Sequence, residues 1–245
     1  MEKNLREYLQ SDLNINSLQA NIIETFIIEV FKSIKEAEER IKQPDNWRKF
    51  RNKKGSSVTV AKVENGDQYY PPEEPNVTTE LGYHLDAIRK NTPADHYLRV
   101  KEIIFSPEKP NYSNEKGGKY SDTPDLTVES LLSENAPSIV FEAKPLYVKG
   151  DVKNRYLGES GIGCFLREKE PYTKEKIAGM IAYTYTNSSD FWNNEINSLS
   201  AGMSNYLNSA LIEQTDTLVT GFDRARLGQL GVFHLILNFD GVFQD

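Results

Sequence analysis

The stretch PSIVFEAKP, residues 137–145, decides how we expect this chain to fold. Its three consecutive apolar residues, 139–141, indicate a strand that is buried on both faces. Strand side chains alternate with a period of two, so Glu142 and Lys144 share one face at the end of that strand. Removing a charge from water is costly unless a partner compensates for it, so two such charges at this place indicate a site. The alternative is an edge strand that carries an exposed salt bridge.

A second strand precedes this one, in the sequence TPDLTVE of residues 123–129. Asp125 and Glu129 lie on one of its faces and the apolar Leu126 lies on the other. Residues 131–137 contain several turn-forming residues, which predicts that the two strands form a hairpin.

A turn near residues 134–135 sets the register of that hairpin. This turn position predicts that Asp125 faces Lys144 and Thr127 faces Glu142, with a register that is good to about two residues. Directly opposed side chains start about 4.5–5.5 Å apart. We therefore expect two carboxylates and a lysine to converge at one point of the sheet.

Carboxylates beside a lysine are suited to a hard cation such as Mg²⁺, with Mn²⁺ as an alternative. Mg²⁺ keeps several waters and binds through one or two carboxylates plus a substrate phosphate. Such a metal polarises the phosphate and lowers the pKa of a bound water, and a lysine can orient that water or stabilise transition-state charge. Other interpretations remain: Asp125 could cap a turn, Asp122 is its rival, and Glu129 is a weaker alternative ligand.

The pattern Pro124-Asp125, then Glu142-x-Lys144, resembles the core motif of the PD-(D/E)xK, or restriction endonuclease-like, nucleases. The resemblance implies that Asp125 and Glu142 bind metal and that Lys144 assists the attacking water. The family often adds a metal-binding carboxylate from a preceding helix, and Glu80 matches that place, although it could equally be a solvated helix residue. The Gln-x-x-x-Tyr motif of the exonuclease branch is not found, which weakens an exonuclease assignment.

The family's order of elements is a helix, three or four strands with the motif on the second and third, then a helix and a further strand. Residues 77–239 follow this order. Apolar periodicity predicts helices at 21–43, 77–90, 172–186 and 190–213, strands at 58–63, 97–105, 124–131, 138–146 and 231–239, and polar loops at 44–57 and 106–121.

This succession predicts an α/β protein with a restriction endonuclease-like core, in which helices flank a central mixed β-sheet. We expect residues 1–75 to form an N-terminal helix, a basic loop and a short strand that pack as an extension. Residues 76–245 are expected to form the nuclease core.

Two basic segments are candidates for weak nucleic-acid contacts, through phosphates and stacked bases. Both could equally be solvated surface charge. The candidates are Arg48, Lys49, Arg51, Lys53 and Lys54 in the first segment, and Lys149, Lys153 and Arg155 after the motif strand.

The composition limits the classes of function. The net charge of -7 is unusual for a DNA-binding protein, so we expect either local positive charge or a partner that supplies the DNA. Cys164 is the only cysteine, which excludes an intrachain disulfide, and the chain begins without an apolar leader. We therefore expect a cytoplasmic protein with no membrane association.

The sequence thus predicts a Mg²⁺-dependent DNA endonuclease, and the family resemblance alone suggests restriction or antiviral defence. One alternative is a nuclease subunit that a helicase or ATPase loads onto DNA. Another is a noncatalytic scaffold that keeps a decayed nuclease fold. An RNA substrate stays open, and a homodimer would suit double-strand cutting, which usually needs two sites.

Overall fold

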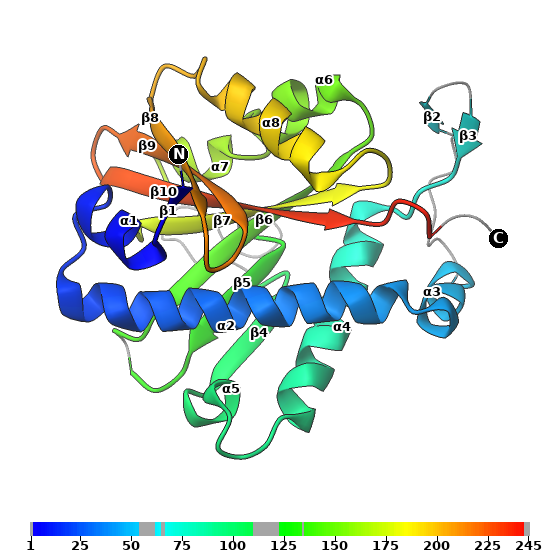
Figure 1. The fold of residues 1–245 in the computed structure, drawn as a ribbon, viewed down its shortest axis with the longest axis horizontal. Helices are drawn as coiled ribbons and strands as arrows, with labels where there is room; N and C mark the ends of the chain where they lie inside the picture. Colours follow the sequence, from blue (N-terminus) through cyan, green and yellow to red (C-terminus); the bar gives the residue numbers. More distant parts are fainter. Residues whose placement is uncertain (1, 54–61, 65–66, 110–122, 134, 243–245) are drawn as a thin grey trace.

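The computed structural model describes residues 2–53, 62–64, 67–109, 123–133 and 135–242, which are arranged around an eight-stranded mixed sheet (Figure 1). The order of strands across this sheet is β1-β8-β9-β10-β7-β6-β5-β4. They are β1 (Glu2–Lys3), β4 (Ile103–Pro107), β5 (Leu126–Ser130), β6 (Ser138–Leu146), β7 (Ile177–Thr184), β8 (Tyr206–Ile212), β9 (Thr217–Arg224) and β10 (Gly228–Asn238). A separate two-stranded sheet pairs β2 (Lys62–Glu64) with β3 (Asp67–Tyr69).

The middle of the large sheet is parallel and its flanks are mainly antiparallel. Strands β6, β7 and β10 run in the same direction, β5 and β9 pair antiparallel to their neighbours, and the short β1 lies parallel to β8. Parallel strands are covered on both faces and read as continuous apolar sequence. Every residue of β7 is buried accordingly.

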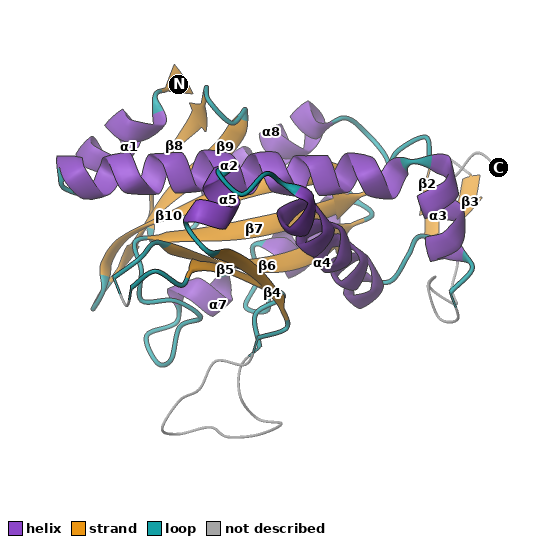
Figure 2. Ribbon diagram, turned by 90° about the horizontal axis from the view of Figure 1, so that it is seen from below, coloured by secondary structure: helices purple, strands orange, loops and turns teal. Residues whose placement is uncertain are grey.

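Two groups of helices cover the two faces of the sheet (Figures 1 and 2). One face carries α1 (Leu5–Ser11), α2 (Ser17–Lys42), α3 (Pro44–Arg51), α4 (Glu74–Asn91) and α5 (Tyr97–Val100). The other carries α6 (Lys149–Asp151), the π-helix η2 (Val152–Tyr156), α7 (Gly163–Leu166) and α8 (Ser189–Ser200). Alternate residues of the central strands point into these two hydrophobic cores, as in β6, where Phe141 enters the first and Val140 the second.

Helix α2 packs in the first hydrophobic core and so makes the N-terminal segment part of it. The Asn16 side chain, just before the helix, accepts a hydrogen bond from Gln19 N and so caps the helix start. Apolar residues such as Phe26 and Ile34 lie fully buried against the sheet and α4. The Glu38 carboxylate accepts a hydrogen bond from Asn238 N at 2.7 Å, at the end of β10. Residues of the segment predicted as an extension therefore share one core with the rest of the sheet.

Several sequence expectations are confirmed. The α/β class with a central mixed sheet between helices is observed. The helices expected at 21–43 and 77–90 correspond to α2 and α4, and the strands expected at 124–131, 138–146 and 231–239 correspond to β5, β6 and β10. None of the described helices is long and apolar enough to cross a lipid bilayer.

Other expectations are wrong, and burial explains most of them. The helix predicted at 172–186 is the strand β7, because a strand buried on both faces lacks the alternation that would reveal it. The loop predicted at 44–57 contains helix α3, which Pro44 begins and whose Trp47 and Phe50 are buried.

Two predicted elements also change type along their length. The segment 97–105, expected to be a strand, contains the short helix α5 first, and β4 begins only at Ile103. The segment 190–213, expected to be a helix, is helical only as far as Ser200, and strand β8 then begins at Tyr206. Strand β9 was not foreseen. The strand expected at 58–63 and the loop expected at 106–121 fall largely outside the described residues.

Gly179 permits the close approach of β7 to β6. It lies opposite Phe141 in the register, and a Cβ atom at this position would come within 2.1 Å of the Phe141 ring. We expect Gly179→Ala to lower the free energy of unfolding by about 1–3 kcal/mol, because the added methyl group would overlap the fully buried Phe141 ring. Chemical denaturation measures this change.

Gly150→Ala is the matched control, since its added Cβ would meet only the Asn154 side chain at 3.8 Å. Equal unfolding free energies for the two variants would contradict the close packing of Phe141 on Gly179.

Candidate active site

The β5–β6 hairpin forms as expected, but its register differs by two residues. Leu126 pairs with Phe141 and Thr127 with Val140, so Thr127 does not face Glu142. A displacement by an even number of residues leaves every side chain on the same face of the sheet. Asp125, Glu142 and Lys144 therefore still converge. The predicted cross-strand pairs, Asp125 with Lys144 and Thr127 with Glu142, are wrong by two residues.

The ladder between β5 and β6 ends at Leu126 and Phe141, and the Asp125 side chain takes over beyond it. Its Oδ2 atom accepts a hydrogen bond from Ala143 N at 2.6 Å. This bond satisfies a strand amide that β5 no longer reaches and fixes the Asp125 carboxylate beside the carboxyl-terminal half of β6.

The ammonium of Lys144 lies among three carboxylates. Its Nζ atom is 2.5 Å from Glu142 Oε1, 3.7 Å from Glu74 Oε1 and 3.9 Å from Asp125 Oδ2. It also donates to the Ala143 carbonyl oxygen at 2.8 Å. Glu142 and Lys144 are only 6% and 8% exposed, so their contact lies in a largely dry environment, where an unpartnered charge is costly.

Glu74 is the member of this cluster that the sequence analysis missed. It is the first residue of α4 and is followed by Pro75, a residue favoured in the first turn of a helix. One turn later the hydroxyl groups of Thr78 and Tyr183 lie 2.9 Å apart, which fixes the start of α4 against β7. The available signal was an acidic residue directly before a proline, which is typical of the first turn of a helix and stands three residues before the helix expected at 77–90.

Glu80, the carboxylate expected from this helix, has other partners. It forms an ion pair with Lys53, and its Oε1 atom is 3.6 Å from His84 Nε2. It lies six helical positions after Glu74, which is about 9 Å along the axis and roughly a third of a turn around it. The expectation that Glu80 joins the site is therefore corrected in favour of Glu74, because the two side chains leave α4 in different directions.

Burial and mutual repulsion shift the pKa values of the cluster. Burial raises the pKa of Glu142 to about 8, the Asp125 carboxylate adds to this rise, and Lys144 opposes it. Burial also raises the pKa of Asp125 and Glu74. Burial alone would lower the pKa of Lys144, but its carboxylate neighbours raise it above the ordinary value, so Lys144 stays a cation.

The oxygen atoms of this cluster fit a hard divalent cation. The Oε2 atom of Glu142 is buried and has no hydrogen-bond partner among the described atoms, and the Asp125 carboxylate lies beside it. No group of three or more acidic, histidine or cysteine side chains in the described ranges is arranged to hold a metal ion. Mg²⁺ needs only one or two carboxylates together with water and phosphate, and Asp125 and Glu142 are the residues here that could hold it.

The other acidic candidates lie elsewhere. Glu129 forms an ion pair with Lys109 near the surface. Asp122, the rival of Asp125, falls outside the described residues.

The predicted basic contacts are mostly occupied by neighbouring side chains or lie on open surface. Arg48 pairs with Asp45 at 2.7 Å and Lys149 with Glu195 at 2.8 Å, while Lys53 pairs with Glu80. Lys49 and Lys153 are exposed, Arg51 is half-buried at the end of α3, and Lys54 lies outside the described residues.

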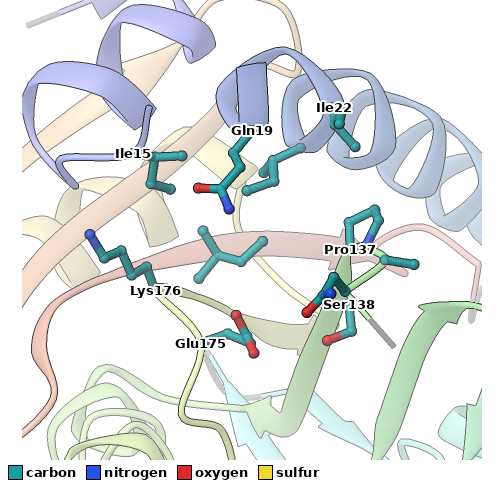
Figure 3. A pocket seen from close by; sticks show the side chains of 11 residues that line it. Ile15, Gln19, Ile22, Pro137, Ser138, Glu175 and Lys176 are labelled. Carbon is teal, nitrogen blue, oxygen red and sulfur yellow. The ribbon is translucent and has the colours of Figure 1, made fainter. Parts of the chain in front are cut away.

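A pocket between α2 and the strand ends is separate from this site (Figure 3). Ile15, Gln19 and Ile22 line one side of it, and Pro137 and Lys176 line the other. It lies where β6 and β7 begin, whereas Lys144 lies near the end of β6. The pocket therefore plays no part in the arrangement around Lys144.

The raised pKa of Glu142 predicts how stability depends on pH without metal. The folded chain holds a proton on Glu142 up to about pH 8, whereas the unfolded chain releases it near the ordinary value of 4.5. Stability from this group is therefore lost as pH rises from 4.5 to 8. We expect Glu142→Gln to gain on the order of 1–3 kcal/mol relative to the unmodified chain between pH 5 and pH 8.

Denaturant unfolding in excess chelator at several pH values measures this difference. Parallel stability curves for the two proteins would show that Glu142 does not titrate in this range.

Comparisons with protein-family models, with curated proteins and with solved structures found no match to this chain. Its functional interpretation therefore rests on the geometry of Asp125, Glu142, Lys144 and Glu74.

Proposed function

We propose that this protein is a metal-dependent nuclease that hydrolyses phosphodiester bonds in DNA, with Asp125, Glu142, Lys144 and Glu74 as its site. The observation that carries the proposal is the ammonium of Lys144 among three carboxylates at the end of a buried parallel strand. In open α/β sheets, ligands bind beyond the carboxyl ends of the strands. A carboxylate cluster at this position suits a metal-assisted reaction.

The order of elements supports a restriction endonuclease-like core. Helix α4 is followed by the short α5, by β4, β5 and β6, then by the helical segment α6–α7, and then by β7. Asp125 directly precedes the second of these strands, and Glu142 and Lys144 stand on the third, which is close to the order that the PD-(D/E)xK resemblance implies.

The proposed roles of the residues follow from their distances. Asp125 and Glu142 would hold Mg²⁺ or Mn²⁺, and the Ala143 carbonyl oxygen lies nearby as a further oxygen ligand. When bound, the metal supplies polarisation of the scissile phosphate and a water of lowered pKa. Glu74, which faces the same ammonium from α4, would hold water molecules around the metal ligands.

Lys144 acts as a positive charge in this proposal. Its pKa is raised by the surrounding carboxylates, so it does not serve as a base before substrate binds. It would donate hydrogen bonds to the attacking water and to the phosphate oxygens, where negative charge grows in the transition state.

Cleavage of plasmid DNA in the presence of Mg²⁺ tests the proposal. We expect Asp125→Asn and Lys144→Met each to lower the cleavage rate by at least about 100-fold, because each removes a group that acts on the reacting phosphate. Glu74→Gln should lower it by about 10- to 100-fold, as loss of a supporting contact does.

Glu80→Gln is the matched control on the same helix, and we expect it to keep the rate within about threefold because Glu80 makes no contact in the site. Circular dichroism and thermal unfolding of each variant exclude misfolding as the cause. Full activity in both Asp125→Asn and Lys144→Met would refute the site.

The distribution of charge favours a second form of the proposal, a nuclease subunit that receives DNA from a partner such as a helicase or ATPase. The chain carries a net charge of -7, and several of its basic residues are already neutralised by neighbours, among them Arg48 and Lys149. Among the described residues, these ion pairs reduce the positive charge that is free to attract a duplex directly.

Salt dependence of DNA binding distinguishes a partner-dependent subunit from an independent enzyme. We expect the non-cleaving Asp125→Asn chain to bind duplex DNA weakly at physiological salt, with a salt slope that corresponds to fewer than about three phosphates. Fluorescence anisotropy between low and physiological salt measures both quantities. Tight binding with a steep slope would contradict the partner-dependent form.

A further inference from the structure

The side chain of Lys144 turns back along its own strand. Its Nζ atom donates to Glu142 Oε1 at 2.5 Å and to the carbonyl oxygen of Ala143, the residue directly before it, at 2.8 Å. A lysine ammonium has three N–H donors. Oxygens of β6 therefore engage two of the three, and at most one is left for a water or a phosphate.

These oxygens of β6 are also the ones that suit a divalent cation. Mg²⁺ and Mn²⁺ prefer carboxylate, carbonyl and water oxygens. Glu142 is a proposed metal ligand, its second oxygen, Oε2, is buried, and none of the described groups forms a hydrogen bond with it. Two cations repel each other strongly at such short distances, so the Lys144 ammonium and a divalent cation compete for the oxygens of Glu142 and Ala143.

Asp125, the other proposed ligand, does not hold the ammonium directly. Its Oδ2 atom is 3.9 Å from Lys144 Nζ, beyond hydrogen-bond distance, and accepts from Ala143 N at 2.6 Å instead. The backbone of β6 therefore fixes the Asp125 carboxylate, whereas the Lys144 ammonium is carried by a long side chain. When a divalent cation binds, the ammonium is the group that moves.

Glu74 lies where it can receive that ammonium. Its Oε1 atom is 3.7 Å from Lys144 Nζ, so a shift of about 1 Å brings the two atoms to the length of a charge-assisted hydrogen bond. The Glu74 side chain is only 19% exposed, which leaves the attraction weakly screened by water. It belongs to the first turn of α4, which the contact between the Thr78 and Tyr183 hydroxyls holds against β7.

We propose that the Lys144 ammonium occupies oxygens of the metal site until a divalent cation binds, and that Glu74 is the positioning residue that then receives it. This inference rests on the metal-dependent nuclease function proposed above. The move frees the N–H groups that Glu142 and Ala143 engage, so they become available to water and to phosphate oxygens. Without a divalent cation the site thus also lacks its catalytic lysine.

Binding of Mn²⁺ in the absence of DNA, followed by electron paramagnetic resonance of the free ion, tests the competition. We expect Lys144→Met to bind Mn²⁺ at least about tenfold more tightly than the unmodified chain, because the competing cation is gone. The same substitution is expected to abolish cleavage, so affinity and activity change in opposite directions. Unchanged or weaker binding by Lys144→Met would overturn the inference.

Lys32→Met is the matched control for the loss of one positive charge. Lys32 is exposed on α2, where it pairs with Glu29 at 3.1 Å. Its affinity for Mn²⁺ should stay within about twofold of the unmodified chain, because solvent and salt screen a distant surface charge. An equal gain in Lys32→Met and Lys144→Met would reduce the effect to net charge and overturn the competition.

A double-mutant cycle tests the role of Glu74. We expect Glu74→Gln to weaken Mn²⁺ binding by about tenfold in the unmodified chain but by less than about threefold in the Lys144→Met chain, which has no ammonium to receive. Glu80→Gln, on the same helix, should stay within about twofold in both chains. Equal factors for Glu74→Gln in the two chains would show that it does not act through Lys144.

Lys144→Gln replaces Lys144→Met in both experiments if the latter does not fold in chelator. Its amide can still donate to Glu142 or Ala143 but carries no charge. We expect the same gain in Mn²⁺ affinity, and its absence would overturn the inference.

Cleavage of DNA, measured separately, distinguishes this inference from the nuclease function. Tighter Mn²⁺ binding by Lys144→Met in a protein that cleaves no DNA would refute only the nuclease function. Cleavage by the unmodified chain together with unchanged Mn²⁺ binding by Lys144→Met would refute only the competition.

Discussion

The ion pair network of Lys144 constrains the rest of this structure. Its ammonium and the Glu142 carboxylate are almost fully buried, and either charge alone would be costly there. The ammonium is tolerated because Asp125 and Glu74, which arrive from two other segments of the chain, join Glu142 around it, whereas burial and the same two carboxylates raise the pKa of Glu142. The hairpin, the start of α4 and the end of β6 must therefore meet at one point, and the packing of α4 on β7 and of β5 on β6 holds them there.

The sequence predicted the hairpin residues of this cluster correctly, but not the residue that the helix α4 contributes. The face shared by Glu142 and Lys144 follows from the period of a strand, and Asp125 joined them because its register error was an even number of residues. Glu74 was not predicted because the helix was expected to begin only at residue 77, although Pro75 is typical of a helix start. Glu80 was chosen from its position on a helix, and only the direction of its side chain excludes it.

Two of the larger errors in secondary structure concern burial that the local sequence does not reveal. Residues 177–184 are all buried, so they lack the alternation that marks a half-exposed strand. The basic segment after Pro44 looked like a loop because its polar residues outnumber its apolar ones, yet Trp47 and Phe50 suffice to anchor α3. Trp47 stacks on Phe239, which follows β10, so this helix depends on a contact that local sequence does not reveal.

The central position of β10 has a consequence for synthesis of the protein. Strand β7 pairs with β6 on one edge, but its other edge is covered only by β10, which follows β8 and β9 along the chain. While the ribosome is still making those strands, the nascent chain carries an apolar strand with an open hydrogen-bonding edge, a template for aggregation. The edge of β7 that lies away from β6 is therefore covered only after β8, β9 and β10 have been synthesised.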